Sequence, residues 1–116
     1  MPDRLSAIHQ ALKQSFGFSD FLSGQQNVIE DVLAGKSVIT IRPTGAGKSL
    51  CYQLPAILMP GMTLVVCPLI ALMKEQVDYL NSVGIAAAYL NSSQSNATKQ
   101  SIERQICEGR IKILYV

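Results

Sequence analysis

The segment VITIRPTGAGKSLCYQL at residues 38–54 contains the arrangement that decides the fold. It opens with residues 38–41, a short β-branched run typical of a buried parallel strand. A loop with two glycines, Gly45 and Gly47, follows at once, and the apolar residues 49–58 after it are suited to a helix. A strand, a glycine loop and a helix in this order predict a loop that holds the phosphates of a nucleoside triphosphate.

The residues of this loop indicate how it would bind phosphate. Glycine lets several backbone N–H groups turn inward, because a Cβ would block the turn or the approach of the phosphate. A lysine is expected to reach the β and γ phosphates, a serine to ligate Mg²⁺, and the following helix to add the partial positive charge of its N-terminus. The predicted triphosphate-binding residues are Thr44, Gly45, Ala46, Gly47, Lys48 and Ser49, with Lys48 as the catalytic residue and Ser49 as the Mg²⁺ ligand.

One position departs from the strict phosphate-loop pattern. The pattern has glycine five residues before Gly47, where this chain has Arg42. An ordinary glycine-rich turn that happens to contain a lysine is therefore the alternative. The helix after the loop carries Pro55, which is expected to kink it or end it early.

Outside this segment the sequence alternates between helix and strand patterns. The second helix is expected to begin at Ser23, whose hydroxyl would form a capping box with Gln26. The alternation predicts an α/β fold with a parallel sheet, helices on both faces and right-handed crossovers. The predicted helices are residues 5–12, 23–35, 70–81 and 97–108, the further strands are residues 63–67, 85–90 and 111–115, and the glycines that end helices are Gly35, Gly84 and Gly109.

The bulk properties favour a small globular protein. With 116 residues, 48% of them hydrophobic and 16% charged, the chain is expected to form one domain. Its apolar runs are shorter than the roughly 20 residues of a membrane span, which predicts no membrane association. Three widely spaced cysteines without metal-ligand spacing fit buried thiols in the cytoplasm. The net charge of +2 says nothing about a nucleic-acid partner.

Three segments, in their order and spacing, resemble the RecQ family of superfamily 2 DNA helicases. They are FGFSDFLSGQ at residues 16–25, PTGAGKSLCYQLPA at residues 43–56 and CPLIALMKEQV at residues 67–77, and LNS at residues 90–92 continues the likeness. The resemblance implies a RecA-like P-loop NTPase domain, a parallel sheet flanked by helices, that uses ATP and Mg²⁺. It also implies 3′-to-5′ unwinding of DNA, with single-stranded or partly duplex DNA as the partner.

The first of these segments implies recognition of adenine. By resemblance, the ring of Phe18 stacks on the base and the amide of Gln25 pairs with its edge. The family usually has arginine where this chain has Leu22. The alternatives are a core position for Phe18 and an amide on the helix surface for Gln25.

The later segments imply contacts with the DNA backbone. By resemblance, Pro68 and Leu69 lie where a strand gives way to a helix whose N-terminal N–H groups face a phosphate. Lys74 would add a positive charge, and a second contact would come from Asn91 and Ser92. The alternatives are a plain turn at Asn91 and Ser92, and core packing for the side chains of Leu69, Ile70, Leu72 and Met73.

The family also has an acidic Asp-Glu-x-His motif, which does not occur in residues 1–116. We therefore expect residues 1–116 to be the N-terminal part of an incomplete first motor domain, truncated before the Walker B strand. Alone it should not turn over ATP, and it should self-associate through an exposed sheet edge. Two other functions remain open: a P-loop kinase for a small molecule, and a module that binds nucleotide or DNA without catalysis.

Overall fold

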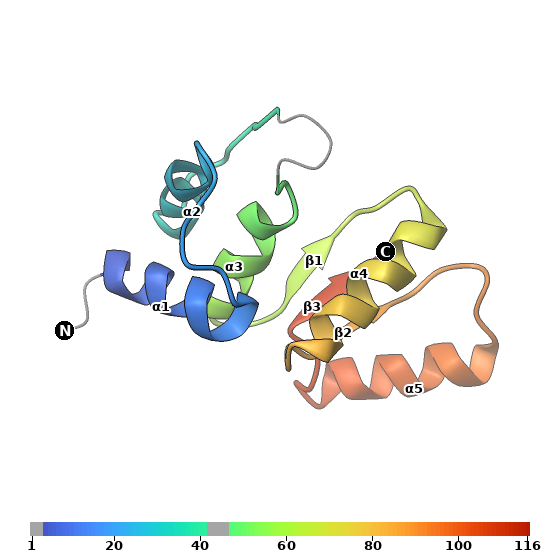
Figure 1. The fold of residues 1–116 in the computed structure, drawn as a ribbon. Helices are drawn as coiled ribbons and strands as arrows, with labels where there is room; N and C mark the ends of the chain where they lie inside the picture. The colour runs from blue at the N-terminus through green and yellow to red at the C-terminus, as the bar shows by residue number, and fades with distance from the viewer. Residues whose placement is uncertain (1–3, 42–46) are drawn as a thin grey trace. The chain divides into compact units, whose positions relative to one another are not determined.

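The computed structural model describes residues 4–41 and 47–116, which belong to two compact units, residues 1–60 and 61–116. The first unit contains three helices, α1 (Arg4–Phe16), α2 (Gln25–Leu33) and α3 (Leu50–Leu58) (Figure 1). The second unit alternates strands with helices: β1 (Thr63–Val65), α4 (Ile70–Ser82), β2 (Ala87–Tyr89), α5 (Asn96–Cys107) and β3 (Ile113–Tyr115). None of these helices is long and apolar enough to cross a membrane.

The core of the first unit forms around α3, which contacts both α1 and α2. Ile8 and Leu12 on the predicted apolar face of α1 are fully buried. The expectation that Pro55 would kink or end α3 early is wrong in one respect, because the helix continues to Leu58 and the N–H of Met59 donates to the carbonyl of Pro55 at 3.0 Å. A proline removes only one donor, and most side chains of α3 are buried, so packing keeps the helix together.

Two local predictions in the first unit are wrong. Residues 38–41 form no strand, and Ile39 and Ile41 are each 94% exposed. A strand needs a hydrogen-bonded neighbour, and no strand of the described residues pairs with this segment. The capping box of Ser23 and Gln26 is also absent, because Gly24 instead of Ser23 is the N-cap of α2 and no side chain caps the helix.

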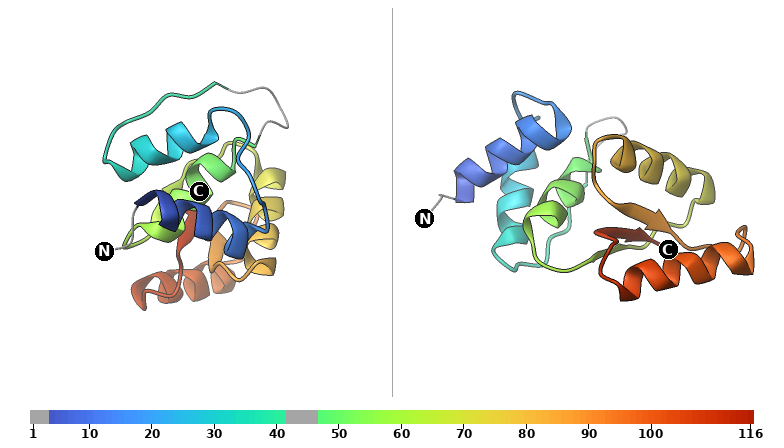
Figure 2. Two further views of the ribbon diagram at one scale, coloured as in Figure 1. Left: turned by 60° about the vertical axis from the view of Figure 1, so that its left-hand side comes forward. Right: turned by 90° about the horizontal axis from the view of Figure 1, so that it is seen from below.

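The second unit contains a three-stranded parallel sheet in the order β1-β3-β2. Leu64, Leu114 and Ala88 are aligned across it, and the latter two pack with Ile102 and Ile106 of α5. Side chains alternate along a strand, so α4 covers the opposite face, as right-handed crossovers require. Figure 2 shows the two helices on either side of the sheet. The predicted α/β class with a parallel sheet flanked by helices is confirmed.

Glycine ends three helices where the sequence predicted it. Gly35, Gly84 and Gly109 have φ of 83°, 85° and 72°. Each closes the helix with two backbone hydrogen bonds, for example from Gly84 to Asn81 and from Ile85 to Leu80. This is the Schellman motif, and it turns the chain from a helix toward the next segment.

The two edges of the sheet differ. On the β2 edge, the side-chain amide of Asn81 accepts a hydrogen bond from the N–H of Ala87 at 3.0 Å and donates one to its carbonyl at 3.2 Å. On the β1 edge, the backbone N–H groups of Thr63 and Cys67 donate hydrogen bonds toward β3. Because backbone groups alternate in direction along a strand, those of Leu64 and Val66 point away from the sheet. One edge is therefore covered by a side chain, whereas no described residue hydrogen-bonds to the backbone of Leu64 or Val66 on the other.

Replacing Asn81 should destabilise the second unit. Asn81→Ala leaves both backbone groups of Ala87 without the amide, and we expect a loss of about 1–3 kcal/mol in the free energy of unfolding. Asn81→Asp keeps the acceptor but loses the donor, so its loss should be intermediate. Urea denaturation measures both, and equal stability of Asn81→Ala and the parent chain would contradict the bridging role.

Candidate functional site

The predicted adenine-binding residues lie near one another in the first unit, in environments that exclude the alternatives. Phe18 is 51% exposed, so it is not a core aromatic residue. Gln25 is 2% exposed, so it is not a surface amide, although it is the first residue of α2. A buried amide must be hydrogen-bonded, which gives this side chain a structural task.

The amide of Gln25 joins two distant segments. Its oxygen accepts a hydrogen bond from the N–H of Leu22 at 2.8 Å, and its nitrogen donates one to the carbonyl of Gly47 at 3.0 Å. Glutamine suits this position because the link needs an acceptor and a donor on the same group. The amide therefore connects the segment of Phe18 to the end of the predicted phosphate loop.

Gly47 has two reasons to be glycine. Its φ of 72° lies in the left-handed region, and a Cβ at this position would collide with the Gln25 amide nitrogen. It would also lie 3.3 Å from the Cδ1 of Leu22. The backbone of Gly47 and the amide of Gln25 therefore lie too close together for a side chain at position 47.

The remaining phosphate-loop residues lie at the start of α3. Ser49 is the N-cap residue, and its carbonyl accepts from the N–H of Gln53 at 2.9 Å, while that of Lys48 accepts from Cys51 at 3.2 Å. Lys48 is exposed. The helix N-terminus thus lies directly after Gly47, as a phosphate site requires. Thr44, Gly45 and Ala46 lie outside the described residues.

A hollow of about 300 Å³ lies at this place in the first unit. Its volume is at the lower end of the range for small-molecule sites. Asp20 and Leu50 belong to it and were not predicted, although the position of Asp20 between Phe18 and Leu22 was a signal. The described residues that line the hollow are Phe18, Asp20, Leu22, Gln25, Gly47 and Leu50.

The predicted DNA-contacting residues of the second unit lie at the carboxyl ends of its strands. Leu69 is the N-cap of α4, directly after Pro68, and is 61% exposed. Core packing was the alternative for the side chains of Leu69, Ile70, Leu72 and Met73. It is correct only for Met73, which is 4% exposed. Ile70 and Leu72 are 47% and 37% exposed.

Lys74 forms an ion pair on the exposed face of α4. Its ammonium lies 2.6 Å from the carboxylate of Asp78, and this hydrogen bond, followed by the charge of Asp78, raises the pKa of Lys74. Exposed pairs of this kind contribute little to stability, because water screens the charges and pairing costs side-chain entropy. Lys74 also lines a hollow of about 340 Å³ with Tyr89 and Ser93, two residues that the sequence did not single out.

Asn91 shapes the turn after β2. Its side-chain oxygen accepts from the N–H of Ser93 at 2.9 Å, and its own N–H donates to the side chain of Gln94 at 3.0 Å. The turn proposed as the alternative is therefore present. Ser92 is exposed within it and remains a predicted contact.

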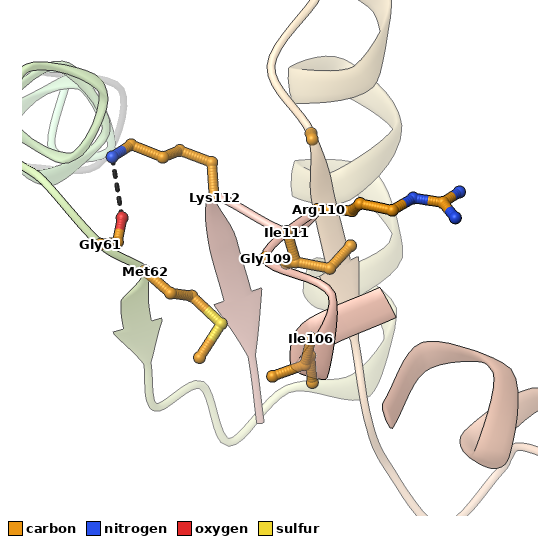
Figure 3. A pocket seen from close by; sticks show the side chains of 8 residues that line it. Gly61, Met62, Ile106, Gly109, Arg110, Ile111 and Lys112 are labelled. Carbon is orange, nitrogen blue, oxygen red and sulfur yellow. Dashed lines mark hydrogen bonds between the residues drawn. The ribbon is translucent and has the colours of Figure 1, made fainter. Parts of the chain in front are cut away.

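A third hollow, of about 610 Å³, lies at the opposite end of the second unit (Figure 3). Met62, Ala86 and Lys112 line it, and each precedes a strand. The side chain of Lys112 donates to the carbonyl of Gly61 at 2.8 Å, the dashed line in Figure 3. In α/β folds ligands bind at the carboxyl ends of strands, so this hollow is not where the predicted site lies.

Residues 23–116 match the DEAD/DEAH box helicase family, and the chain belongs to that family. The chain is 48% identical to the ATP-dependent DNA helicase RecQ of Haemophilus influenzae, in a match covering 90% of this chain and 17% of that protein. It is 45% identical to the probable ATP-dependent DNA helicase RecS of Bacillus subtilis, covering 97% of this chain and 22% of the relative. The ATP-dependent DNA helicase Q-like 5 of Arabidopsis thaliana is 46% identical, in a match covering 94% of this chain and 12% of that protein.

These matches confirm the resemblance to RecQ helicases that the sequence motifs predicted. The chain spans less than a quarter of each of these three relatives.

Substituting Gly47 should disrupt the first unit more than substituting a glycine that lacks close neighbours. Gly47→Ala and Gly35→Ala both place a Cβ at positive φ, which costs about 1–2 kcal/mol. Only Gly47→Ala also forces the Gln25 amide away, since nothing lies within 4 Å of a Cβ at Gly35. We expect a further loss of about 1–3 kcal/mol in the free energy of unfolding. Equal losses in urea denaturation would show that the contact is unimportant.

Proposed function

We propose that the first unit binds ATP with Mg²⁺. The observation that carries this is the buried amide of Gln25, which connects the segment with the exposed ring of Phe18 to Gly47 of the phosphate loop. A base-binding surface and a phosphate-binding surface are thereby held side by side. The printed names of the relatives, which call them ATP-dependent, support ATP as the nucleotide.

In this proposal each part of the site has a separate task. The ring of Phe18 stacks on the base, the residues from Thr44 to Ser49 surround the phosphates, and Lys48 neutralises charge on the β and γ phosphates. The hydroxyl of Ser49 is a hard oxygen ligand of the kind that Mg²⁺ accepts. Bound Mg²⁺ supplies charge neutralisation when a phosphoryl group is transferred.

We propose that the second unit contacts the backbone of single-stranded or partly duplex DNA. The exposed start of α4, after Pro68 and Leu69, presents N–H groups suited to a phosphate. Lys74 can leave its exposed pair with Asp78 for a DNA phosphate, and the turn with Asn91 and Ser92 lies at the same end of the sheet. The hollow shared by Lys74 and Ser93 supports a joint role of helix and turn.

For the whole protein we propose an ATP-dependent 3′-to-5′ DNA helicase in which residues 1–116 are part of the first motor domain. The residues present here would bind nucleotide but not hydrolyse it, because the carboxylates that orient the attacking water are not among them. A cytoplasmic location fits the thiols of Cys51, Cys67 and Cys107, which form no disulfide within the described part of the chain. A small-molecule kinase and a non-catalytic module are the alternatives that experiment must exclude.

The proposal predicts that Lys48→Ala weakens ATP binding by the 116-residue chain about tenfold or more, because a charge-assisted contact with the phosphates is lost. Titration with a fluorescent ATP analogue in Mg²⁺ measures this. Lys13→Ala, which removes an exposed lysine of α1, is the matched control and should bind as the parent chain does.

In the full-length protein, the same substitution should abolish ATP hydrolysis, which should require single-stranded DNA. Turnover of ATP that is indifferent to DNA and transfers the γ-phosphoryl group to a small molecule instead of water would favour the kinase. Binding without any turnover at full length would favour the module.

We also propose that the 116-residue chain self-associates through the β1 edge of the sheet. The backbone of Leu64 and Val66 points away from β3, and their side chains are 56% and 80% exposed. No charged residue occurs in residues 61–69, so two antiparallel copies of this edge meet without like-charge repulsion. An open, apolar edge of this kind is a template for a second strand.

A lysine on this edge should prevent the association. We expect Leu64→Lys to be monomeric by light scattering at concentrations where the parent chain is dimeric, because a charged side chain blocks strand addition. Leu72→Lys, which alters a 37% exposed leucine of α4, should leave the dimer intact. A parent chain that stays monomeric at all concentrations would contradict the proposal.

A further inference from the structure

We infer that Gln94 is a positioning residue for DNA binding, because its side chain holds the turn with Asn91 and Ser92 in the shape that meets the DNA backbone. The turn connects β2 to α5 at the carboxyl end of the sheet (Figure 1). The inference rests on the proposed DNA contact of the second unit and adds the residue that fixes the geometry of that contact. In this role Gln94 acts through the turn and does not touch the DNA itself.

The side-chain amide of Gln94 joins the turn to the end of β2. Its oxygen accepts a hydrogen bond from the N–H of Asn91 at 3.0 Å, and its nitrogen donates one to the carbonyl of Tyr89 at 2.8 Å. Both are distances of well-formed N–H···O bonds. Tyr89 is the last residue of β2, so one side chain fixes the place where the chain leaves the strand. A neutral amide suits this task because it carries a donor and an acceptor on one group.

The carbonyl that Gln94 binds lies on the outer edge of β2. The N–H of Leu90 donates toward β3, to the carbonyl of Tyr115 at 2.9 Å. Because backbone groups alternate in direction along a strand, the carbonyl of Tyr89 points away from β3. Gln94 therefore anchors the turn to a backbone group that the sheet does not use, and the ladder between β2 and β3 continues undisturbed.

Asn91 extends the link from the turn to α4. Its side-chain oxygen accepts a hydrogen bond from the N–H of Ser93 at 2.9 Å, and its side-chain nitrogen lies 3.5 Å from the sulfur of Met73. Met73 is 4% exposed and precedes Lys74 in α4, so the turn is tied next to the lysine proposed to contact DNA. A thioether is a weak acceptor, and the two bonds of Gln94 to the backbone are the stronger constraint.

A fixed turn favours DNA binding for two physical reasons. Hydroxyl and N–H groups donate to a phosphate oxygen only at about 3 Å and in a suitable direction. A turn that is already ordered also loses less conformational entropy when the DNA binds. Ser92 and Ser93 are exposed between the two residues that the Gln94 amide holds together, whereas Gln94 is half-buried. The exposed serines therefore face solvent from a turn whose shape the glutamine sets.

The test replaces Gln94 with methionine, which keeps the length of the side chain and removes both hydrogen bonds. Fluorescence anisotropy measures the binding of a labelled oligothymidine to the 116-residue chain at several salt concentrations, and circular dichroism checks that the variant is folded. We expect Gln94→Met to weaken binding about fivefold, as for the loss of one hydrogen bond. The slope of the logarithm of affinity against that of salt should fall by about 0.7, the value for one phosphate contact on a single strand.

A double-mutant cycle separates positioning from a purely structural role. Ser92→Ala should weaken binding less in the Gln94→Met background than in the parent chain, because the contact of the turn is already lost there. If Gln94 only covered the edge of β2, its replacement would lower the urea midpoint but leave the affinity of the folded chain for DNA unchanged.

Gln105→Met is the matched control. The amide of Gln105 donates to the hydroxyl of Ser101 at 3.4 Å within α5, and the next residue, Ile106, lines the hollow at the opposite end of the unit. This variant should bind the oligonucleotide as the parent chain does.

Nuclear magnetic resonance of the parent chain gives a second readout, which decides the matter if Gln94→Met does not fold. The oligonucleotide should shift the backbone amide signals of Ser92 and Ser93 and leave the side-chain amide signals of Gln94 nearly unchanged. Unchanged affinity and salt slope in folded Gln94→Met, or side-chain signals of Gln94 that shift as strongly as those of the serines, would overturn the inference alone. A parent chain that binds no oligonucleotide would overturn the proposed DNA contact as well.

Discussion

The hydrogen bond from the buried amide of Gln25 to the carbonyl of Gly47 is the constraint on which the first unit depends. It joins residues 22 positions apart and brings the segment after α1 to the start of α3. Gly47, with its left-handed backbone and no Cβ, makes room for the amide. The oxygen of the same amide accepts a hydrogen bond from the N–H of Leu22. Loss of either partner would therefore disturb both the segment that carries Phe18 and the start of α3.

Sequence reasoning succeeded where the signal is local. The glycines that end helices at positions 35, 84 and 109 need only their own backbone geometry, and all three lie where the pattern placed them. The alternation of short apolar runs with helices likewise predicted the parallel sheet of the second unit. The order of three motifs predicted the family, because their spacing is far more specific than the phosphate loop alone.

The errors arose where a residue depends on a distant partner. Residues 38–41 have every local property of a buried strand, but a strand forms only beside another, and none of the described strands pairs with them. Ser23 and Gln26 match a capping box, yet the link from Gln25 to Leu22 determines the start of α2 instead. The position of Asp20 in the hollow depends on how the segment after α1 folds back, and its place between Phe18 and Leu22 was only an indirect signal of this.

The unequal edges of the three-stranded sheet give the second unit a direction of growth. On one side, the amide of Asn81 is hydrogen-bonded to both backbone groups of Ala87. A further strand cannot join there without first displacing this side chain. On the other side β1 offers its backbone to any extended segment. Extra strands added to this fold, by evolution or by a protein engineer, would therefore be accommodated next to β1 and resisted next to β2.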